Sequence, residues 1–415
     1  MHVAVIGAGM VGVSCAWALQ RRGLKVTLLD RTEAGRETSH GNAGVLSPTS
    51  LLPFNHPGVW RQLPRLLAGK HPGFRTTPTY LLAHGRPLVS FMAHARPSVL
   101  AVTAQALHAL ITLSRSLHGA WYAQAGVSRH LREQGWLLLY RSAQAWQDAQ
   151  WSRDQYAQHG LDVVSLDADA LSALEPAVHS RFMRALWVRG AASVDDPGHV
   201  VRALARVIVE RGGQFLQSEV RSLTPRVGGG WVIHSAVAGL EADQVVLAMG
   251  PWSRDWLRAM WNWRLPMIHE RGYHMHYDWR GPGLGRPVYD TSSGYVLSPM
   301  GQGVRLSTGV ELEEQHCAPS EAMLAQAQEA ARKVFPLGDR RDAQAWHGSR
   351  PTLPDSRPMI GPCPERPGLW LALGHQHIGF STGPGSGELL AALMTNESPP
   401  IDAAPFSPRR FGRFW

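Results

Sequence analysis

Apolar and polar positions divide the first part of the chain into a strand, a helix and a second strand. The apolar run from Val3 to Ile6 predicts a short buried strand over residues 2–6. The run LKVTLLD predicts a second buried strand, which ends at Asp30. Between them, Gly23 ends a helix predicted over residues 10–22, whose apolar positions recur at helical spacing: Val11, Cys15, Ala18 and Leu19. A strand, a helix and a further strand in this order are typical of a nucleotide-binding unit.

Three glycines after the first strand support this interpretation. Gly7 makes the tight turn, Gly9 lets a pyrophosphate approach the backbone, and Gly12 lets the helix pack closely on the strand. The free N–H groups at the start of the helix favour a phosphate. Asp30 lies at the strand end, where a carboxylate can accept hydrogen bonds from ribose hydroxyls. The motif predicts a bound dinucleotide without distinguishing NAD from FAD.

The stretch RETSHGNAGVLSPTS, residues 36–50, bears on that choice. A nicotinamide-binding fold normally continues with a helix here, whereas this chain has small, polar and glycine-rich residues. Such a loop offers many backbone N–H groups, which can lie along a second phosphate and pass beneath a flat ring. An ordinary surface loop is the alternative on local grounds. The stretch favours FAD over NAD.

Later segments extend the same architecture. Residues 198–210 predict an amphipathic helix, residues 215–220 a strand and residues 245–248 a buried strand. Residues 369–373 predict another strand, and a helix is expected to begin near 384–388. The runs GWLLLY, GYHMHYD and VRLSTGVEL would form a mixed sheet elsewhere. The expected class is α/β, with a Rossmann-like domain and a second α+β domain built on a mixed sheet.

Composition narrows the function classes. The 415 residues are 44% hydrophobic and 18% charged, which excludes general disorder. The formal charge is +9, for which a compositional bias and an anion-attracting surface both remain open. The basic residues are scattered, which argues against a nucleic-acid stripe. The 3 cysteines are too few for a disulfide framework or a metal cluster. No secretory signal and no apolar run of ~18–20 residues is recognised.

Two segments carry a resemblance to a known family. VIGAGMVGVSCAWALQRRGLKVTLLD followed by ETSHGNAGVLSP resembles the FAD-dependent D-amino acid oxidase superfamily, most closely its bacterial D-amino acid dehydrogenase branch with D-hydroxyproline dehydrogenase-like members. HGSRPTLPDSRPMIGPCPERPGLWLALGHQHIGFSTGPGSGELLAALM resembles the family's closing unit: an R-P-x-x-P-D segment, a strand, a glycine-rich loop and a helix. The resemblance implies noncovalent FAD, because AWHGSRPTLPD lacks the cysteine that bonds the flavin in sarcosine oxidase.

The resemblance also implies which residues hold the cofactor. Thr38 and Ser39 would approach the pyrophosphate, residues 42–44 would pass near the flavin ring, and the backbone at Val220 would lie beside the adenine. Met249 replaces the threonine of the family's A-T-G turn. The full set of candidate cofactor contacts is Gly7, Gly9, Met10, Val11, Gly12, Asp30, Arg31, Thr38, Ser39, Asn42, Ala43, Gly44, Val45, Val220, Ala248, Gly250, Trp252, Gly379, Phe380, Ser381 and Thr382.

Arg350, in GSRPTLPD, matches the family arginine that pairs with the substrate carboxylate. A guanidinium suits this role because it can give a carboxylate two parallel hydrogen bonds. HERGYHMHYD and DTSSGYVLSP are expected to be neighbouring strands, and alternation places Arg271 and Tyr273 on one face. Tyr273 and Tyr295 are candidates to contact the carboxylate, with half-buried strand aromatics as the alternative. The arginine that follows the corresponding strand of glycine oxidase is absent.

Histidines near the glycine-rich loop complete the candidate site. His375 and His377 flank this loop, and His377 is included as the fourth catalytic candidate. His274 and His276 share a strand face, and no carboxylate partner is expected near them. No metal site is therefore predicted.

The candidate pieces suggest two discontinuous domains. Segments 1–48, 194–255 and 345–398 would form the FAD-binding domain, while 49–193 and 256–344 would form the substrate-binding domain. A ligand pocket is expected between them.

A tail over residues 399–415 follows these domains. Its end combines basic and aromatic residues: Arg409, Arg410, Phe411, Arg413, Phe414 and Trp415. Docking on an anionic membrane and a frayed terminus are both open.

Taken with the resemblance, these features predict an FAD-dependent oxidoreductase that acts on CH–NH2 or CH–NH bonds. A D-amino or cyclic imino acid, of the D-proline or D-hydroxyproline type, is the favoured substrate. A glycine- or sarcosine-type oxidase using O2 and a non-catalytic flavin-binding protein are the alternatives. The family implies a quinone or the respiratory chain as electron acceptor, and a location in the cytoplasm, with peripheral contact to the inner membrane left open.

Overall fold

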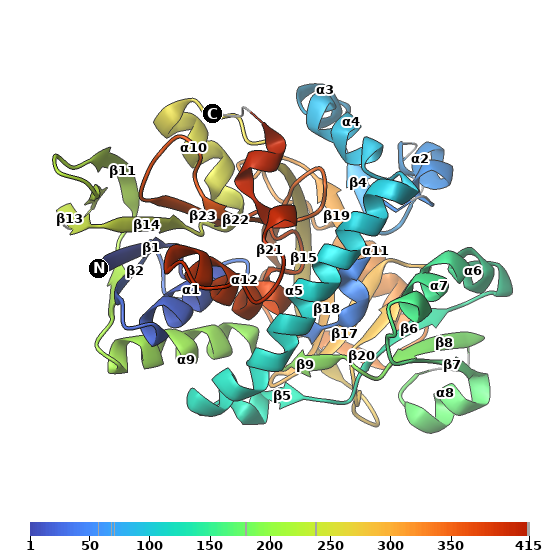
Figure 1. The fold of residues 1–415 in the computed structure, drawn as a ribbon. Coiled ribbons are helices and arrows are strands. Elements are labelled where there is room, and N and C mark those ends of the chain that lie inside the picture. Colours follow the sequence, from blue (N-terminus) through green and yellow to red (C-terminus); the bar gives the residue numbers. More distant parts are fainter. Residues whose placement is uncertain (57, 68, 70, 179–180, 237–238, 413–415) are drawn as a thin grey trace.

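The computed structural model describes residues 1–412, apart from 57, 68, 70, 179–180 and 237–238. Its six-stranded sheet lies in the left half of Figure 1 and contains both predicted N-terminal strands. Neighbouring strands are parallel except for the last pair. The order is β10 (Gln214–Gln217), β2 (Lys25–Asp30), β1 (His2–Ile6), β14 (Gln244–Leu247), β23 (Leu369–Leu373) and β22 (Met359–Pro362).

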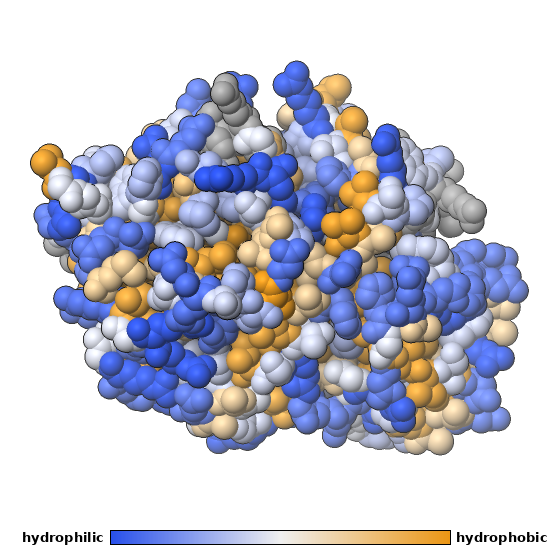
Figure 2. Space-filling model, viewed as in Figure 1, coloured by the Kyte–Doolittle hydropathy of each residue, from blue (hydrophilic) through white to orange (hydrophobic). Residues whose placement is uncertain are grey.

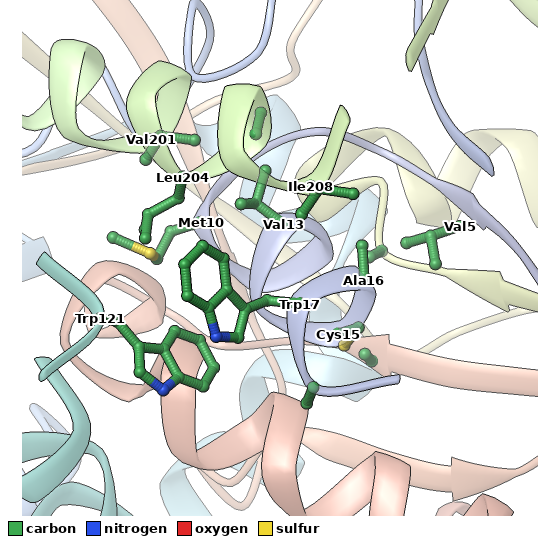
Figure 3. Packing of buried hydrophobic residues seen from close by; sticks show 14 of the residues in the cluster. Val5, Met10, Val13, Cys15, Ala16, Trp17, Trp121, Val201, Leu204 and Ile208 are labelled. Carbon is green, nitrogen blue, oxygen red and sulfur yellow. The ribbon is translucent and has the colours of Figure 1, made fainter. Parts of the chain in front are cut away.

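Helices pack closely against one another beside this sheet. α1 (Met10–Arg21) runs along α12 (Gly379–Met394) and also contacts α9 (Pro197–Glu210). Figure 3 shows Trp17 of α1 against Trp121, with ring centroids 5.3 Å apart. The same view shows side chains of α9 meeting α1: Val201, Leu204 and Ile208. This core fixes the start of α1 at the carboxyl end of β1.

A second, eleven-stranded sheet lies beside the first unit. Its main path is β4 (Phe74–Thr76), β19 (Val310–Leu312), β15 (Ile268–Trp279), β18 (Gly303–Ser307), β17 (Tyr295–Met300), β16 (Val288–Asp290), β6 (Trp136–Tyr140), β8 (Arg184–Val188) and β7 (Val163–Asp167). β20 (Leu337–Arg340) and β21 (Trp346–Thr352) also pair with β15. Parallel and antiparallel pairs both occur, so the predicted α/β fold with a mixed second sheet is confirmed.

Two small sheets and the remaining helices complete the fold. The small sheets are β11 (Val220–Pro225), β12 (Trp231–Ser235) and β13 (Gly239–Ala242), and β3 (Val45–Leu46), β9 (Ala192–Val194) and β5 (Leu131–Arg132). The other helices are α2 (Val59–Leu67), α3 (Pro78–Ala83), α4 (Gly85–Ala93), α5 (Pro97–Gln124), α6 (Ala143–Asp148), α7 (Gln150–Gln158), α8 (Ala168–Leu174), α10 (Ser253–Trp261) and α11 (Ala322–Arg332).

α5 is the one helix in the described part of the chain that is long and apolar enough to cross a membrane, although no such run is expected from the sequence. It packs against α12, and Leu107, Leu110 and Ile111 are buried. Figure 2 shows hydrophilic residues over most of the visible face, with apolar residues gathered along the line of α5. These contacts account for the apolar residues on its packed side, while 44% of its most apolar 18-residue window is buried.

Three expected elements differ in the structure. The strand predicted over 215–220 is split between β10 and β11, because the Ser218 N–H donates to Asp30 and the chain then leaves the six-stranded sheet. β18 separates β15 from β17, so those two strands are not neighbours. α12 begins at Gly379 and contains Pro384, where the helix was expected to begin.

The C-terminal tail is packed against the protein instead of frayed through its described part. Phe406 is fully buried, and Arg410 Nε donates to Asp355 Oδ2 at 2.6 Å. The Arg410 guanidinium also lies 4.4 Å from the ring of Phe411. Arg409 is exposed. Arg413, Phe414 and Trp415 lie outside the described residues.

Candidate functional site

The turn after β1 is built so that backbone approaches backbone. Gly7 has a φ of +108°, and a Cβ there would lie 2.3 Å from the Ala248 carbonyl oxygen. A Cβ at Gly12 would lie 1.8 Å from the Gly7 carbonyl oxygen. A Cβ at Gly9 would meet only the Ser39 Oγ, at 3.3 Å. Gly7 and Gly12 thus serve close packing, while Gly9 leaves the space that a phosphate needs.

Two side chains prepare this end for a nucleotide. Ser39 Oγ accepts a hydrogen bond from the Met10 N–H at 2.9 Å, which ties the 36–50 loop to the start of α1. Asp30 accepts hydrogen bonds from the Ala8 N–H at 2.7 Å and the Thr32 N–H at 3.0 Å. Burial raises the pKa of Asp30, and these hydrogen bonds oppose the shift. A carboxylate has further acceptor positions, so Asp30 can still accept from a ribose.

A cavity of about 820 Å³ extends from this turn to β15 and β21. That volume lies in the upper part of the range of ligand pockets. Three candidate cofactor residues do not line it: Gly12, Gly44 and Thr382. The candidates that line it are Gly7, Gly9, Met10, Val11, Asp30, Arg31, Thr38, Ser39, Asn42, Ala43, Val45, Val220, Ala248, Gly250, Trp252, Gly379, Phe380 and Ser381.

The cavity lining fits an extended dinucleotide such as FAD. Among the described residues, the buried Thr38 Oγ1 and Ser218 Oγ have no hydrogen-bond partner in the protein, and both residues line the cavity. Arg31 and Trp252 both line the cavity, and the Arg31 guanidinium lies 4.3 Å from the Trp252 ring centroid. None of Cys15, Cys317 and Cys363 lines the cavity, and noncovalent attachment of FAD stays a prediction.

A buried arginine anchors the loop at residues 36–50. Arg305 on β18 donates from Nη1 to the carbonyl oxygens of His40 at 2.8 Å and Asn42 at 2.5 Å. Its Nε donates to His276 Nε2 at 3.0 Å, and His276 Nδ1 lies 2.8 Å from Asp342 Oδ2. Burial lowers the pKa of Arg305 to about 10. The expectation that no carboxylate lies near His274 and His276 is wrong, because the turn after β20 brings Asp342 there. Within the described residues, no group of three or more His, Cys, Asp or Glu could hold a metal ion.

We expect Arg305→Met to weaken cofactor binding roughly 10-fold or more. The variant removes two hydrogen bonds from a charged donor, and such bonds contribute about 1.5–3 kcal/mol each. Loop residues 40–42 would lose their anchor, and the melting temperature of the cofactor-free protein should also fall, because both bonds lie within the protein. Fluorescence titration of cofactor-free protein with FAD gives the dissociation constant. Arg341→Met is the matched control, since Arg341 is exposed and pairs with Asp278 at 3.3 Å. Equal FAD affinity in Arg305→Met and wild type would contradict the anchoring role.

Arg350 lies at the other end of the cavity, on β21. Its Nη1 donates to the Gly309 carbonyl oxygen at 2.8 Å and its Nη2 to the Thr308 carbonyl oxygen at 3.3 Å. A Cβ at Gly272 would lie 2.5 Å from Nη2, so the guanidinium rests on that glycine. Burial lowers the pKa of Arg350, and nearby Glu270 opposes this. The residue lines the cavity as a cation held by neutral carbonyls.

The two candidate tyrosines are differently placed from expectation. The Tyr273 hydroxyl donates to Glu311 and accepts from the Ser320 N–H, so it is already bonded, although Tyr273 borders the cavity. Burial, followed by the hydrogen bond to Glu311, raises the pKa of Tyr273 to about 12. Tyr295 does not line the cavity. It is fully buried in the core of the second sheet, and alternation instead turns Val296 to the cavity.

The same alternation decides which face of β15 meets the cavity. Arg271 Nε donates to Glu311 Oε2 at 3.0 Å on the face that Tyr273 shares. Glu270 lines the cavity from the opposite face, and Gly272 lies on that face under Arg350. Sequence analysis identified the two faces and took its candidate, Tyr273, from the face opposite to Glu270, although both residues line the cavity. β15 holds two carboxylates, and Glu270 is the one inside the strand, whereas Asp278 lies at its exposed end; that difference was the signal that could have singled out Glu270.

His377 lines the cavity, and its buried Nδ1 has no partner within the described chain. Burial, with a smaller contribution from Arg350, lowers the pKa of His377 to about 3. The ring is therefore neutral at ordinary pH. His375 Nε2 lies 3.0 Å from Ser386 Oγ, which ties this histidine to α12. Of the two, His377 is the one with a ring nitrogen left unpaired.

Comparison with known proteins agrees with this geometry. The family described as "DAO: FAD dependent oxidoreductase" matches residues 2–393. A D-amino-acid oxidase of Bradyrhizobium diazoefficiens is 29% identical, covering 99% of each chain. D-amino acid dehydrogenase 2 of Pseudomonas aeruginosa is 32% identical, covering 98% of each chain. The crystal structure of glycine oxidase from Geobacillus kaustophilus has a TM-score of 0.74 at 22% identity, covering 98% of this chain and 97% of its own. The crystal structure of L-proline dehydrogenase from P. horikoshii has a TM-score of 0.73 at 18% identity, and the match covers 99% of this chain and 97% of that one.

Proposed function

The chain belongs to the DAO family of FAD-dependent oxidoreductases, and from this premise we propose that it oxidises the C–N bond of a D-amino or cyclic imino acid. Substrates of the D-proline or D-hydroxyproline type are favoured. FAD, when bound, accepts the hydride from the substrate α-carbon. The imino product then hydrolyses in water.

Arg350 is the observation that carries this proposal. Its guanidinium lines the cavity and, among the described residues, donates to two backbone carbonyl oxygens and to no carboxylate. The two carbonyl oxygens are neutral, so they leave the positive charge of Arg350 unbalanced. A substrate carboxylate would balance that charge. Binding through the carboxylate would orient the α-carbon, because the planar guanidinium fixes the direction of approach.

Apolar side chains around the same cavity would exclude water during the transfer. Phe54, Phe91, Val296 and Leu312 all line it. Their presence favours an amino acid with an apolar or ring-shaped side chain over glycine itself. A glycine- or sarcosine-type oxidase remains the second enzyme candidate, since the glycine oxidase of Geobacillus kaustophilus shares the fold.

The electron acceptor and location are also proposals. We propose a quinone or the respiratory chain as acceptor, because a relative is named D-amino acid dehydrogenase. We also propose a location in the cytoplasm, from which peripheral contact with the inner membrane would give access to such an acceptor. In the described part of the tail, Arg409 is exposed and open to such contact, whereas Asp355 holds Arg410.

Anaerobic titration of the FAD-loaded protein with paired D- and L-amino acids tests the reaction. We expect D-proline and D-hydroxyproline to bleach the visible flavin band, and their L-isomers, glycine and sarcosine to bleach it far more slowly. Reoxidation by a quinone faster than by O2 would support the proposed acceptor. Faster bleaching by sarcosine would favour the oxidase alternative. A flavin that no amino or imino acid reduces would leave a non-catalytic flavin-binding protein.

A further inference from the structure

A buried carboxylate with one unpaired oxygen among the described residues lines the cavity beside Arg350. Glu270 is only 2% exposed, and in the described part of the chain its Oε2 has no hydrogen-bond partner. A buried carboxylate normally finds a cation or several N–H donors, because removing its charge from water is costly. The Thr352 hydroxyl also stabilises the Glu270 carboxylate. Oε2 itself has no donor within the described chain, and a ligand that enters the cavity can supply one.

Strand register places Glu270 and Arg350 on the same wall. The two residues are directly opposed in the antiparallel β15–β21 pair, so their side chains leave the same face of the sheet. The Arg350 guanidinium rests on Gly272, two positions along β15, where a Cβ would lie 2.5 Å from Nη2. Within the described residues no ion pair of 4.0 Å or less joins Arg350 to Glu270 or to another carboxylate. The wall thus presents a positive and a negative group side by side, each bordering the cavity.

Arg350 and Glu270 are oppositely charged groups that both border the cavity, so they can bind a ligand that carries both a negative and a positive group. Arg350 influences Glu270 electrostatically: burial raises the pKa of the Glu270 carboxyl, and the guanidinium opposes that shift. A carboxylate ligand alone would satisfy Arg350 and leave its own charge close to Glu270. A zwitterion would satisfy both groups, because its nitrogen donates N–H bonds while its carboxylate accepts them.

We propose that Glu270 binds the primary or secondary ammonium nitrogen of the substrate while Arg350 binds its carboxylate, so that the pair selects α-amino and α-imino acids over simple carboxylic acids. This inference rests on the proposed function, whose substrate class it narrows. Glu270 acts here as a specificity-determining residue through direct contact with the substrate nitrogen.

The test compares two ligands of the same shape on FAD-loaded protein. 2-Aminoisobutyrate carries an ammonium group and a carboxylate but no α-hydrogen, so it cannot be oxidised. Pivalate replaces its ammonium group with a methyl group. Each is titrated against the visible flavin spectrum, and wild-type protein should bind 2-aminoisobutyrate more tightly. Glu270→Gln should weaken binding of 2-aminoisobutyrate roughly 10- to 100-fold, as expected for loss of a hydrogen bond to a charged group. Binding of pivalate should stay the same or tighten.

Ser307→Ala is the matched control. Ser307 also lines the cavity, and its buried Oγ has no partner among the described residues, but it carries no charge. This variant should change neither affinity by more than roughly 3-fold. Glu270→Asp keeps the charge and should lose less affinity for 2-aminoisobutyrate than Glu270→Gln. If Glu270→Gln does not retain FAD, the affinities of Glu270→Asp for the two ligands test the inference in its place.

Several outcomes would overturn the inference. The inference fails if Glu270→Gln weakens the binding of both ligands equally or leaves the binding of 2-aminoisobutyrate unchanged. It also fails if the wild-type protein binds neither ligand. A lower melting temperature with both affinities intact would assign Glu270 a structural role instead. The two proposals can also fail separately. If the wild-type protein binds 2-aminoisobutyrate through Glu270 but no D-amino acid reduces its flavin, the proposed function is refuted and this inference stands.

Discussion

Arg350→Met lowers kcat/KM for the best amino acid substrate roughly 10²- to 10⁴-fold. Two hydrogen bonds from a charged donor are lost, each contributing about 1.5–3 kcal/mol, and about 1.4 kcal/mol corresponds to a factor of ten. Methionine also leaves the Thr308 and Gly309 carbonyl oxygens without the donors that Arg350 now supplies. Stopped-flow reduction of the flavin under anaerobic conditions separates weaker binding from slower hydride transfer. We expect the apparent dissociation constant to carry most of the loss.

Two companion variants sharpen this result. Arg350→Lys keeps the charge without the planar fork, so its kcat/KM should fall between those of wild type and Arg350→Met. Arg271→Met removes an arginine from the opposite face of β15, where it donates to Glu311 and to the Cys317 carbonyl oxygen at 2.7 Å. That variant should lower the melting temperature while the folded fraction keeps its affinity for substrate. Undiminished activity of Arg350→Met would exclude Arg350 as the carboxylate site.

Gly12→Ala prevents assembly of the nucleotide-binding unit. The added Cβ would lie 1.8 Å from the Gly7 carbonyl oxygen, and backbone atoms on both sides cannot move aside cheaply. Overpacking of a core by a single methyl group costs about 1–3 kcal/mol in tolerant places, and this overlap should exceed that. A loss of that size is a large share of the roughly 5–15 kcal/mol that stabilises a typical protein. Soluble yield and thermal melting provide the measurement, and a folded variant with normal FAD content would refute the packing argument.

Gly9→Ala is the comparison that separates packing from binding. Its Cβ would meet only the Ser39 Oγ, at 3.3 Å, so the variant should fold with nearly normal stability. The methyl group would nevertheless occupy the surface that the pyrophosphate is expected to approach. FAD affinity should fall at least about 10-fold, measured by fluorescence titration. Normal FAD affinity in this variant would place the pyrophosphate elsewhere.

Local sequence determined the nucleotide-binding unit almost completely. The strand over 2–6, the helix beginning at Met10 and the strand ending at Asp30 all agree with β1, α1 and β2. Each of these elements follows from rules that act over a few residues: apolar runs, helical spacing and glycines in a turn. The family motifs also identified Arg350 and most of the residues that line the nucleotide end of the cavity.

α12 shows where such rules fail. GFSTGPGSGELL has the composition of a loop, yet α12 begins at Gly379. Its glycines face neighbouring helices: a Cβ at Gly387 would lie 2.3 Å from the Ser14 carbonyl oxygen, and one at Gly385 would lie 2.6 Å from Ser114 Oγ. Small residues are required here because α1 and α5 approach closely, and this packing offsets the poor helix propensity of glycine.

The sequence by itself therefore determined the family and the cofactor, and it identified Arg350 as the candidate cation for a substrate carboxylate. Only the tertiary structure decided which face of β15 meets the cavity, and with it that Glu270 lies beside Arg350 while Tyr273 bonds to Glu311. Only the fold, likewise, brought Arg305 of β18 to the loop at residues 40–42. The physical reason is that alternation along a strand defines two faces but not their surroundings. Strand pairing between segments far apart in the chain assigns one face to the core and the other to the ligand.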